Sequence, residues 1–547
     1  MTKEPLFSFC MPLHHSSRKS VQRAISSIID QDYKSWELII GINGRRKKQL
    51  IDKIKKFDDK RISYFTLDQA NVCKARNEAA KRSKGEYISF FSSDFILYPG
   101  MLRLWVETFL QHPTVDFLFG GYRFTDRMQV LHLTGPWQKV DRFLLESENY
   151  IDGGMPMRKW VWETNRWDES LKSLNDWDFW LRATDGERAT VAEPLIRKQR
   201  AIGHYIPDFA YAADSPKPGG LSYDSHENWK KRTAEIRMRN DIPEKSICVV
   251  SHGAPYHGIE MARILNADFK KDPHFKPNDY EMIYLLGFYL NGIESHVHVV
   301  KPHPHTPKDC LRVVHHIGGD TYQFGNMVSL EGMKRLVKGL KDNGVIHLCE
   351  TEDAQKELAQ YGIDAKIIPI PSAITNHKIL PVPKVFRVAI YYPIDKDPTA
   401  KYLEGLTAAI TQEMKDTKFI LYGCDKYDGI KDGNVQYKGW VDMEWLARKC
   451  TLMVRLVRHD SVPIACTDFL RFGRPVITNI PNMSYMEYVD ITPDTVMKNA
   501  RDMVIERIQA HKEGKVFKTD YHSAKAYWDK LLSHETYKKN IYGLLNG

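Results

Sequence analysis

A regular alternation of short strand-like runs with amphipathic helical runs constrains this chain most, because it recurs three times along the sequence. The first series predicts strands at 7–11, 36–42, 62–67 and 87–91, with helices at 20–31, 47–57 and 71–83 between them. Strands that alternate with helices at this spacing favour a parallel sheet covered by helices on both faces. We therefore expect an α/β fold.

Two further series follow. The second predicts strands at 246–251, 296–300, 313–316, 345–349 and 365–370, and the third at 386–391, 418–422, 435–438, 452–456 and 475–478. Segments rich in Pro, Gly and Ser separate the series at 207–221 and 379–384. The tail at 500–545 has helical spacing. With 547 residues, this pattern is typical of three to four domains.

The composition fits globular domains and narrows the partners only slightly. Hydrophobic residues make up 42% of the chain and charged residues 27%, which excludes disordered and fibrous classes. Lys and Arg number 79 against 69 for Asp and Glu, a formal charge of +10. Such a surplus attracts polyanions such as nucleotide sugars, nucleic acid or anionic lipid headgroups, without distinguishing among them.

Cysteine and apolar patterns point to a cytoplasmic protein. The eight cysteines form no CxxC pair and no zinc-like spacing, so we expect reduced, partly buried thiols. The amino-terminal residues lack the pattern of a secretory signal. The most apolar run, 282–290, is shorter than the ~20 residues needed to span a bilayer, and we expect it to form a buried helix.

Polar residues follow successive strands of the first series. They are Asn43 after the second strand, Arg76 near the start of the third helix, and Asp94 after the fourth strand. Parallel α/β units bind ligands at the carboxyl ends of their strands, so these residues are expected to meet at one edge. A carboxylate there can hold a divalent cation that bridges a diphosphate, because hard cations prefer oxygen ligands.

These runs resemble family 2 glycosyltransferases of the GT-A fold. The resemblance covers Gln31-Asp32-Tyr33, the strand at 36–40, Ala75-Arg76-Asn77 and the run at 85–88. It implies a nucleotide-sugar-dependent glycosyltransferase domain at 1–205, with Asn43, Arg76 and Asp94 at the donor and Mn²⁺ or Mg²⁺ on Asp94. The family's Asp-x-Asp pair is represented here by Ser92 and Asp94.

The run at 165–182 resembles the acceptor-side segment of the same family, which implies that Asp176 is the general base. An inverting transfer needs a carboxylate that accepts the proton of the acceptor hydroxyl. His204 could be a further metal ligand, or an ordinary loop histidine. The alternative for Asp176 and Asp178 is that they cap a helix. Trp177 is expected in the core, as is Trp180.

The third series contains a second candidate site. Asp460 and Asp468 lie eight residues apart, slightly over two helical turns, so both carboxylates could project near one ligand, and a helix that begins near 460–463 could offer N–H groups to an anion. This segment resembles the carboxyl-terminal domain of family 4 glycosyltransferases of the GT-B fold, whose Glu-x7-Glu motif it carries with two aspartates. The resemblance implies donor contacts at Asp460, Asp468, Lys401 and Arg458.

The second and third series together resemble a two-lobed GT-B module of twin Rossmann-like lobes. We expect a linker at 206–244, an acceptor-side lobe at 245–384, a nucleotide-sugar-side lobe at 385–500 and carboxyl-terminal helices at 501–547. His257 is the candidate acceptor-side base of this module, for which the resemblance implies no metal.

The leading hypothesis is a glycosyltransferase with two modules. It would move sugars from UDP- or GDP-type donors to a glycan or lipid-linked acceptor, in two sequential steps if both modules are active. Peripheral membrane contact is compatible with the basic surplus. Two alternatives stay open: one module is a degenerate binding domain, or the acceptor is a hydroxylated base in DNA.

Overall fold

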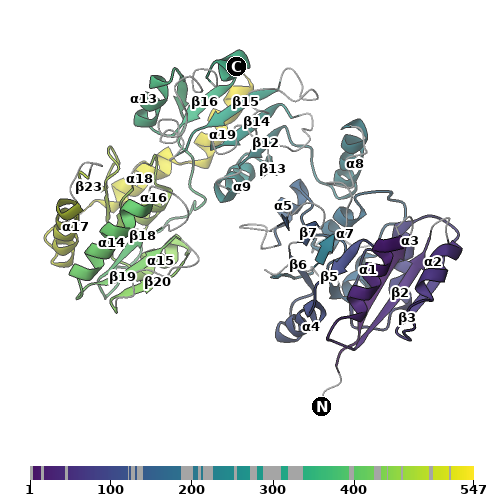
Figure 1. Cartoon of the computed structure of the whole chain (residues 1–547). Coiled ribbons are helices and arrows are strands. Elements are labelled where there is room, and N and C mark those ends of the chain that lie inside the picture. Colours follow the sequence, from purple (N-terminus) through teal and green to yellow (C-terminus); the bar gives the residue numbers. More distant parts are fainter. Residues whose placement is uncertain are drawn as a thin grey trace. The chain divides into compact units, whose positions relative to one another are not determined.

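The computed structural model divides the chain into two compact units (Figure 1). Unit 1 comprises Met1–Lys245 and Asp268–Lys270, and unit 2 comprises Ser246–Ala267 and Lys271–Gly547. The structure describes residues 4–13, 18–43, 47–120, 122–124, 130–131, 140–185, 201–206, 211–213, 226–251, 255–270, 280–287, 310–317, 337–392, 400–423, 433–439, 441–457, 460–491, 497–516 and 519–546.

A seven-stranded sheet forms the centre of unit 1, in the order β10-β6-β9-β4-β1-β2-β3. Its strands are β1 (Phe7–Leu13), β2 (Trp36–Ile42), β3 (Ile62–Thr66), β4 (Tyr87–Ser89), β6 (Phe117–Gly120), β9 (Met157–Arg158) and β10 (Gly203–Ile206). All neighbours pair in parallel except β9, which is antiparallel to β4 and β6. The predicted parallel sheet is therefore confirmed, with one reversed strand inserted.

A smaller sheet and eight helices complete unit 1. The smaller sheet has the order β5-β11-β7-β8, with β5 (Phe95–Leu97), β7 (Tyr122–Phe124), β8 (Val130–Leu131) and β11 (Tyr211–Ala213). The helices are α1 (Arg18–Ile29), α2 (Lys47–Ile54), α3 (Val72–Arg82), α4 (Met101–Gln111), α5 (Arg142–Ser147), α6 (Lys159–Asn165), α7 (Asn175–Ala183) and α8 (His226–Arg239). The segment predicted as a linker, 206–244, thus contains β11 and α8.

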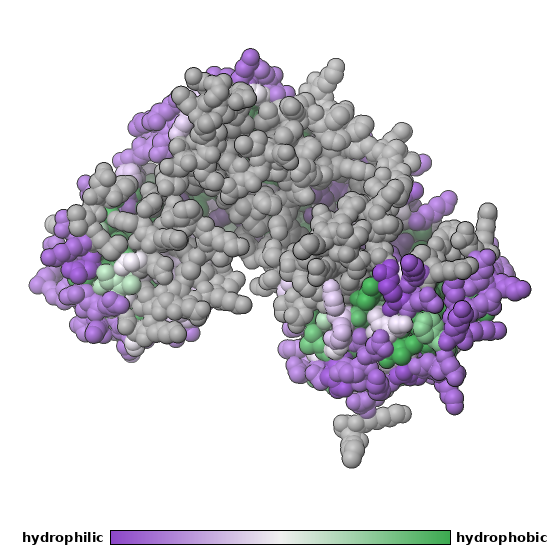
Figure 2. All heavy atoms as spheres, in the orientation of Figure 1, coloured by the Kyte–Doolittle hydropathy of each residue, from purple (hydrophilic) through white to green (hydrophobic). Residues whose placement is uncertain are grey.

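The core of unit 1 follows from the mostly apolar central strands. Strand β1 is buried along nearly its whole length, as expected for a strand covered on both faces. Helix α3 packs against β1 and β2. Trp105 of α4 stacks on Phe7, with ring centroids 5.8 Å apart. In the view of Figure 2 the described surface of this unit is mainly hydrophilic, with apolar residues showing in a limited area.

Unit 2 contains two parallel sheets. The first includes β12 (Ile247–Val250), β14 (Met282–Leu286), β15 (Leu311–His315), β16 (Ile346–Cys349) and β17 (Ala365–Ile367) in that order, with α9 (Pro255–Ile264) and α13 (Glu352–Gln360). The strand β13 (Asp268–Lys270) groups with unit 1. The predicted helix at 282–290 is wrong, because its described part forms β14. A short apolar run fits a buried strand as well as a buried helix, and the sequence offered no way to separate them.

The second sheet of unit 2 has the order β20-β19-β18-β21-β22-β23. Its strands are β18 (Arg387–Tyr391), β19 (Lys418–Tyr422), β20 (Val435–Tyr437), β21 (Leu452–Arg455), β22 (Val476–Thr478) and β23 (Glu487–Tyr488), with helices α14 (Ala400–Glu413), α15 (Met443–Lys449) and α16 (Ile464–Arg471). The tail forms α17 (Met497–Lys512), α18 (Tyr521–Leu531) and α19 (His534–Leu545), as predicted. Strand order reverses between β18 and β21, the usual position of a ligand crevice.

The predicted fold class, α/β with parallel sheets, is confirmed. The seven cysteines in the described ranges are buried and not disulfide-bonded. Across those ranges, no helix is both long enough and apolar enough to cross a bilayer.

Candidate active site

Two of the predicted donor residues lie beyond the carboxyl ends of β2 and β4, the parallel strands on either side of β1 in unit 1. Asn43 directly follows β2 and is buried, and its backbone N–H donates to the carbonyl of Leu13 at 3.0 Å. Asp94 lies beyond β4, is half-buried, and accepts a hydrogen bond from the Ser92 hydroxyl. Ser92 thus stands beside Asp94 as a hydrogen-bond donor, where the family has a second carboxylate.

Helix α3 and its N-cap residue hydrogen-bond to the segment that precedes α7. Asn77 is buried and fully bonded: its amide donates to the Trp167 carbonyl (2.8 Å) and to Glu169 (3.0 Å), and its oxygen accepts from the Trp162 indole N–H and the Trp167 N–H, both at 3.0 Å. The Asn71 amide donates to the Glu169 carbonyl at 2.7 Å. These bonds fix the backbone that leads to the candidate base.

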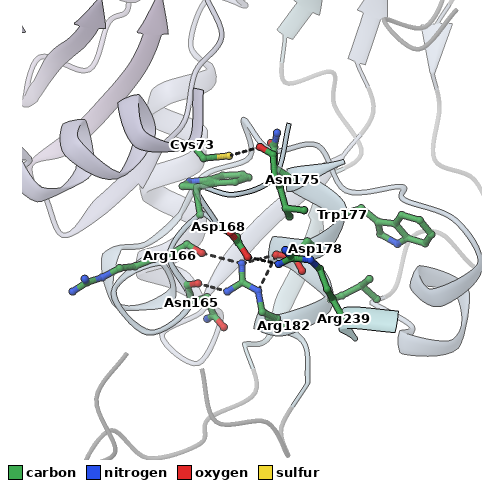
Figure 3. A network of polar contacts seen from close by, with 12 residues as sticks. Cys73, Asn165, Arg166, Asp168, Asn175, Trp177, Asp178, Arg182 and Arg239 are labelled. Carbon is green, nitrogen blue, oxygen red and sulfur yellow. Dashed lines mark hydrogen bonds and ion pairs between the residues drawn. The ribbon is translucent and has the colours of Figure 1, made fainter. Parts of the chain in front are cut away.

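Helix α7 carries two acids, Asp176 and Asp178, with different surroundings, and Figure 3 shows the polar network around Asp178. Asp178 is 2% exposed; its carboxylate accepts from Arg182 at 2.8 and 3.0 Å and from the Asn240 amide at 3.1 Å. The capping interpretation is wrong for both acids, because the N-cap position is Leu174, whose side chain makes no cap hydrogen bond. Asp178 is therefore a structural residue of the network in Figure 3.

Asp176 is the acid of α7 whose carboxylate is bound by few protein groups. It is half-buried, and its one hydrogen bond is from the Trp177 backbone N–H at 3.0 Å. No Lys, Arg or His of the described chain forms an ion pair with it. Gly153 approaches closely: a Cβ on this glycine would lie 3.2 Å from the Asp176 Cβ and 3.1 Å from Trp167. Trp177 and Trp180 are buried, as predicted.

Arg76 of α3 points to the acceptor-side segment. Its Nη1 donates to the Asn175 side-chain oxygen at 2.7 Å, and its guanidinium lies 4.2 Å from the centroid of the Trp167 ring. Both partners belong to the segment that carries Asp176. The donor contact of Arg76 stays a prediction, and the contacts described here link Arg76 to the acceptor-side segment.

The structure does not bring His204 to Asp94. The His204 ring stacks on His112, with centroids 4.6 Å apart, and desolvation together with His112 lowers its pKa. His112 follows the end of α4, and a helix between parallel strands ends at the amino edge of the sheet, opposite Asp94. Across the described ranges, no group of three or more His, Cys, Asp or Glu could hold a metal ion.

The acids of unit 2 are engaged by other protein groups. Asp460 follows β21 and accepts two hydrogen bonds from Arg455, the Nε contact being 3.0 Å, while Arg455 lies over the Tyr391 ring at 4.3 Å. The other carboxylate oxygen of Asp460 accepts a hydrogen bond from the Ser461 N–H at 3.0 Å. This ion pair lies at the reversal point between β18 and β21.

Asp468 is 4% exposed and accepts three hydrogen bonds on one oxygen. The donors are the Ser372 hydroxyl at 2.6 Å, His377 Nε2 at 3.0 Å and Arg471 Nη2 at 2.5 Å. Ser372 and His377 belong to the segment between the two sheets of unit 2. The sequence analysis expects a donor contact at Asp468, and the structure places this residue in a buried cluster that holds the connecting segment.

His257 lies on the first turn of α9 and faces the second sheet across unit 2. Its side chain retains solvent exposure, yet desolvation by the surrounding protein lowers its pKa, against the opposing effect of Asp460 and Asp468. Lys401 lies on α14, but its side chain is outside the described residues, as is Arg458 altogether. Of the predicted unit 2 residues, His257 and Asp460 are brought toward each other.

A cavity of about 610 Å³ adjoins Asp460. It is lined by the end of β16 and the start of α13, by the loops after β21 and β22, and by α18. Two hydrogen bonds cross beside it, from Ser461 to Glu350 and from the Asn482 amide to Asp353 at 2.9 Å. The volume is within the range of small-molecule sites.

Sequence reasoning missed several residues that shape these sites. Trp167, Gly153, Ser372 and His377 all act through partners about 15 to 100 residues away. For Gly153 a signal existed, because adjacent glycines between apolar segments often mark close approach of the backbone to another group.

Comparison with known proteins decides the class of unit 1. The family model Glycosyl transferase family 2 matches residues 8–158. Residues 8–158 form a family 2 glycosyltransferase domain. The predicted activity class, a nucleotide-sugar-dependent glycosyltransferase, is confirmed for this domain.

Relatives match about a quarter to a third of the chain. An uncharacterized glycosyltransferase of Methanocaldococcus jannaschii is 24% identical over 207 residues, 36% of this chain and 71% of that protein. The UDP-Glc:α-D-GlcNAc-diphosphoundecaprenol β-1,3-glucosyltransferase WfgD of Escherichia coli is 28% identical over 127 residues, 23% of this chain and 49% of that protein.

Solved structures are similar at a lower level. The S. aureus TarS 1–349 crystal structure is 18% identical with a TM-score of 0.32, and the match covers 43% of this chain and 64% of that fragment. TM-scores this low transfer no substrate, cofactor or site.

Proposed function

We propose that unit 1 transfers a sugar from a nucleotide-sugar donor to an acceptor hydroxyl with inversion of the anomeric centre, and that Asp176 is the general base. One observation carries this proposal. Asp176 is an acid on the acceptor-side helix whose carboxylate has no cationic partner, while its neighbour Asp178 is fully bonded. A carboxylate with this freedom can accept a proton.

The proposed reaction is one displacement at the anomeric carbon of the donor sugar. The acceptor oxygen attacks the anomeric carbon and loses its proton to Asp176, while the bond from the anomeric carbon to the phosphate oxygen breaks. The nucleoside diphosphate leaves with the electron pair of that bond. The hydrogen bonds from Asn77 of α3 to Trp167 hold the segment that carries the base in place during this displacement.

The proposed cofactor site is Asp94. One half-buried carboxylate with a neighbouring hydroxyl fits a divalent cation whose remaining ligands are water and the donor's phosphate oxygens. When bound, Mn²⁺ or Mg²⁺ would offset the charge that develops on the leaving diphosphate. His204 is not part of this proposal, because it stacks on His112.

The donor is proposed to be a UDP- or GDP-sugar, and the acceptor a glycan or a lipid-linked saccharide. Support comes from the relative WfgD, whose name describes glucose transfer from UDP-Glc to a lipid-diphosphate-linked sugar.

A thermal-shift screen of UDP- and GDP-sugars, with and without Mn²⁺, tests the donor and the metal together. Binding at 100 times the dissociation constant stabilises the folded state by about 2.7 kcal/mol, enough to resolve. We expect a shift that requires Mn²⁺ and is lost in Asp94→Ala. An Mn²⁺-dependent shift that is as large in Asp94→Ala as in the wild type would refute the Asp94 site, whereas a shift that does not need Mn²⁺ would belong to another site.

A second candidate function concerns unit 2, which we propose is a GT-B-like module with a nucleotide-sugar site of its own. It is favoured by the Arg455–Asp460 pair at the reversal point of the sheet, beside the 610 Å³ cavity and opposite His257. Nucleotide binding that persists in Asp94→Ala and disappears in Asp460→Asn would support it.

A further inference from the structure

Among the residues that the structure describes, no carboxylate forms an ion pair with Arg76. Its Nη1 donates to an amide oxygen, that of Asn175, and its guanidinium stacks on Trp167. Its Nε is buried and has no hydrogen-bond partner in the described structure. Elsewhere in unit 1 the half-buried arginines are paired with acids, as Arg182 is with Asp178 and Arg142 with Glu146.

The remaining face of this guanidinium is turned toward the candidate base. A Cβ placed on Gly153 would lie 3.7 Å from Arg76 Nη2 and 3.2 Å from the Asp176 Cβ. The two side chains therefore border the same small space in front of Gly153. Gly153 itself is buried, whereas Arg76 and Asp176 are each half-buried, so an anion would approach them from their exposed sides.

A guanidinium held in this way is suited to bind an anion. The indole stack and the Asn175 bond fix its plane, so little side-chain freedom is lost when a ligand binds. A planar fork of N–H donors matches phosphate or carboxylate oxygens. A partly desolvated charge without a counter-ion is unfavourable, and an anionic ligand removes that cost.

We infer that Arg76 binds an anionic group of the acceptor, phosphoryl or carboxylate, that lies close to the hydroxyl deprotonated by Asp176. The inference rests on the proposed function of unit 1 and narrows its acceptor to an anionic one. The acceptor is favoured over the donor because both partners of Arg76 belong to the segment that carries the base, while Asp94 follows β4.

The substitution Asn175→Glu tests this inference. It would put a carboxylate against Arg76 and neutralise the guanidinium without removing it, so the packing on Trp167 is retained. Gln111→Glu is the matched control, because it adds the same charge at an exposed position at the end of α4. Arg76→Gln, which keeps a donor for Asn175, is the second variant if Asn175→Glu fails to fold.

Binding would be measured on the full chain by saturation-transfer NMR, with saturating UDP or GDP and Mn²⁺ present to fill the donor site. The probes are sn-glycerol 3-phosphate, glycerate and, as the neutral match, glycerol. We expect at least one of the two anions to bind the wild type and Gln111→Glu, at least fivefold weaker binding in Asn175→Glu, and no binding of glycerol. Equal anion binding in folded Asn175→Glu and wild type, or binding of glycerol as tight as that of the anions, would overturn the inference.

The donor is separated in a second arm, in which UDP and GDP binding with Mn²⁺ is measured by calorimetry. Nucleotide affinity within twofold of wild type in Asn175→Glu supports the acceptor assignment. A tenfold loss there would make Arg76 a donor contact and overturn it. Neither result depends on transfer, so the proposed role of Asp176 is judged separately by its own variant.

Discussion

The two units present their acids in opposite states. In the described part of unit 1, Asp176 has a single backbone hydrogen bond and no cationic partner, and Arg76 has no acidic partner. In unit 2, Asp460 is paired with Arg455, and Asp468 holds three donors in the interior. The comparison teaches that a motif acid becomes available for chemistry only where the fold leaves it without a counter-ion.

Low pH should destabilise unit 2 before unit 1, because the described part of unit 2 has three buried histidines on or next to the neighbouring strands β15 and β16. Desolvation lowers the pKa of His315 to about 3 and of His347 to about 4, and lowers that of His316 well below its usual value. The unfolded chain then binds protons that the folded unit cannot, so stability is complete above about pH 6.5 and falls as the pH decreases toward 4.

At about 1.4 kcal/mol per pKa unit, the loss is on the order of 3 kcal/mol for each of His315 and His347. Hydrogen exchange resolved by mass spectrometry would measure it, since the peptides of each unit report separately. We expect the core of unit 2 to lose protection at pH 4.5 before that of unit 1. Earlier loss in unit 1 would contradict the placement of these histidines.

Asp468→Ala should destabilise unit 2 by about 3–5 kcal/mol, because it removes the buried one of the two acids paired with the Arg471 guanidinium and also removes the acceptor of Ser372 and His377. The same exchange measurement reports the loss. Asp416→Ala is the control; it removes an exposed ion pair with Lys512 and should change little. If Asp468→Ala leaves unit 2 as stable as wild type and abolishes nucleotide binding, Asp468 is a ligand contact as the sequence suggested.

Gly153→Ala should reduce kcat about tenfold, because the added methyl group would press on Trp167 and shift Asp176 by a few tenths of an ångström. The expected change in KM for the donor is small. Gly433→Ala serves as the control, since nothing lies within 4 Å of a Cβ there. A full rate in Gly153→Ala would show that the position of Asp176 tolerates this shift.

The sequence predicted the sheets well because parallel strands buried on both faces are nearly continuous apolar runs, as in β1 and β21. It failed at 282–290, where length alone had to separate strand from helix. It placed Asp176 and Asp460 at strand and helix ends correctly, since those positions follow from local periodicity.

The sequence did not predict the side chains that bind Asp468 and Arg76. Asp468 is bound by Ser372 and His377, about 90 residues earlier, and Arg76 by Asn175, 99 residues later. Contacts across such separations depend on how the elements pack, which periodicity does not encode. The sequence therefore predicted Asp468 and Arg76 alike as donor contacts. In the structure, Asp468 is enclosed by three hydrogen-bond donors, whereas Arg76 has no acidic partner among the described residues.

The most direct test of the account compares Asp176→Asn with Asp460→Asn in the full chain, by following the nucleoside diphosphate released from the donor found in the thermal-shift screen. Loss of a general base typically costs 10²–10⁴-fold in rate. We predict a loss of about that size in Asp176→Asn, with donor binding unchanged, and a rate near wild type for the same donor in Asp460→Asn. A wild-type rate in Asp176→Asn together with a dead Asp460→Asn would place the chemistry in unit 2 and contradict the account.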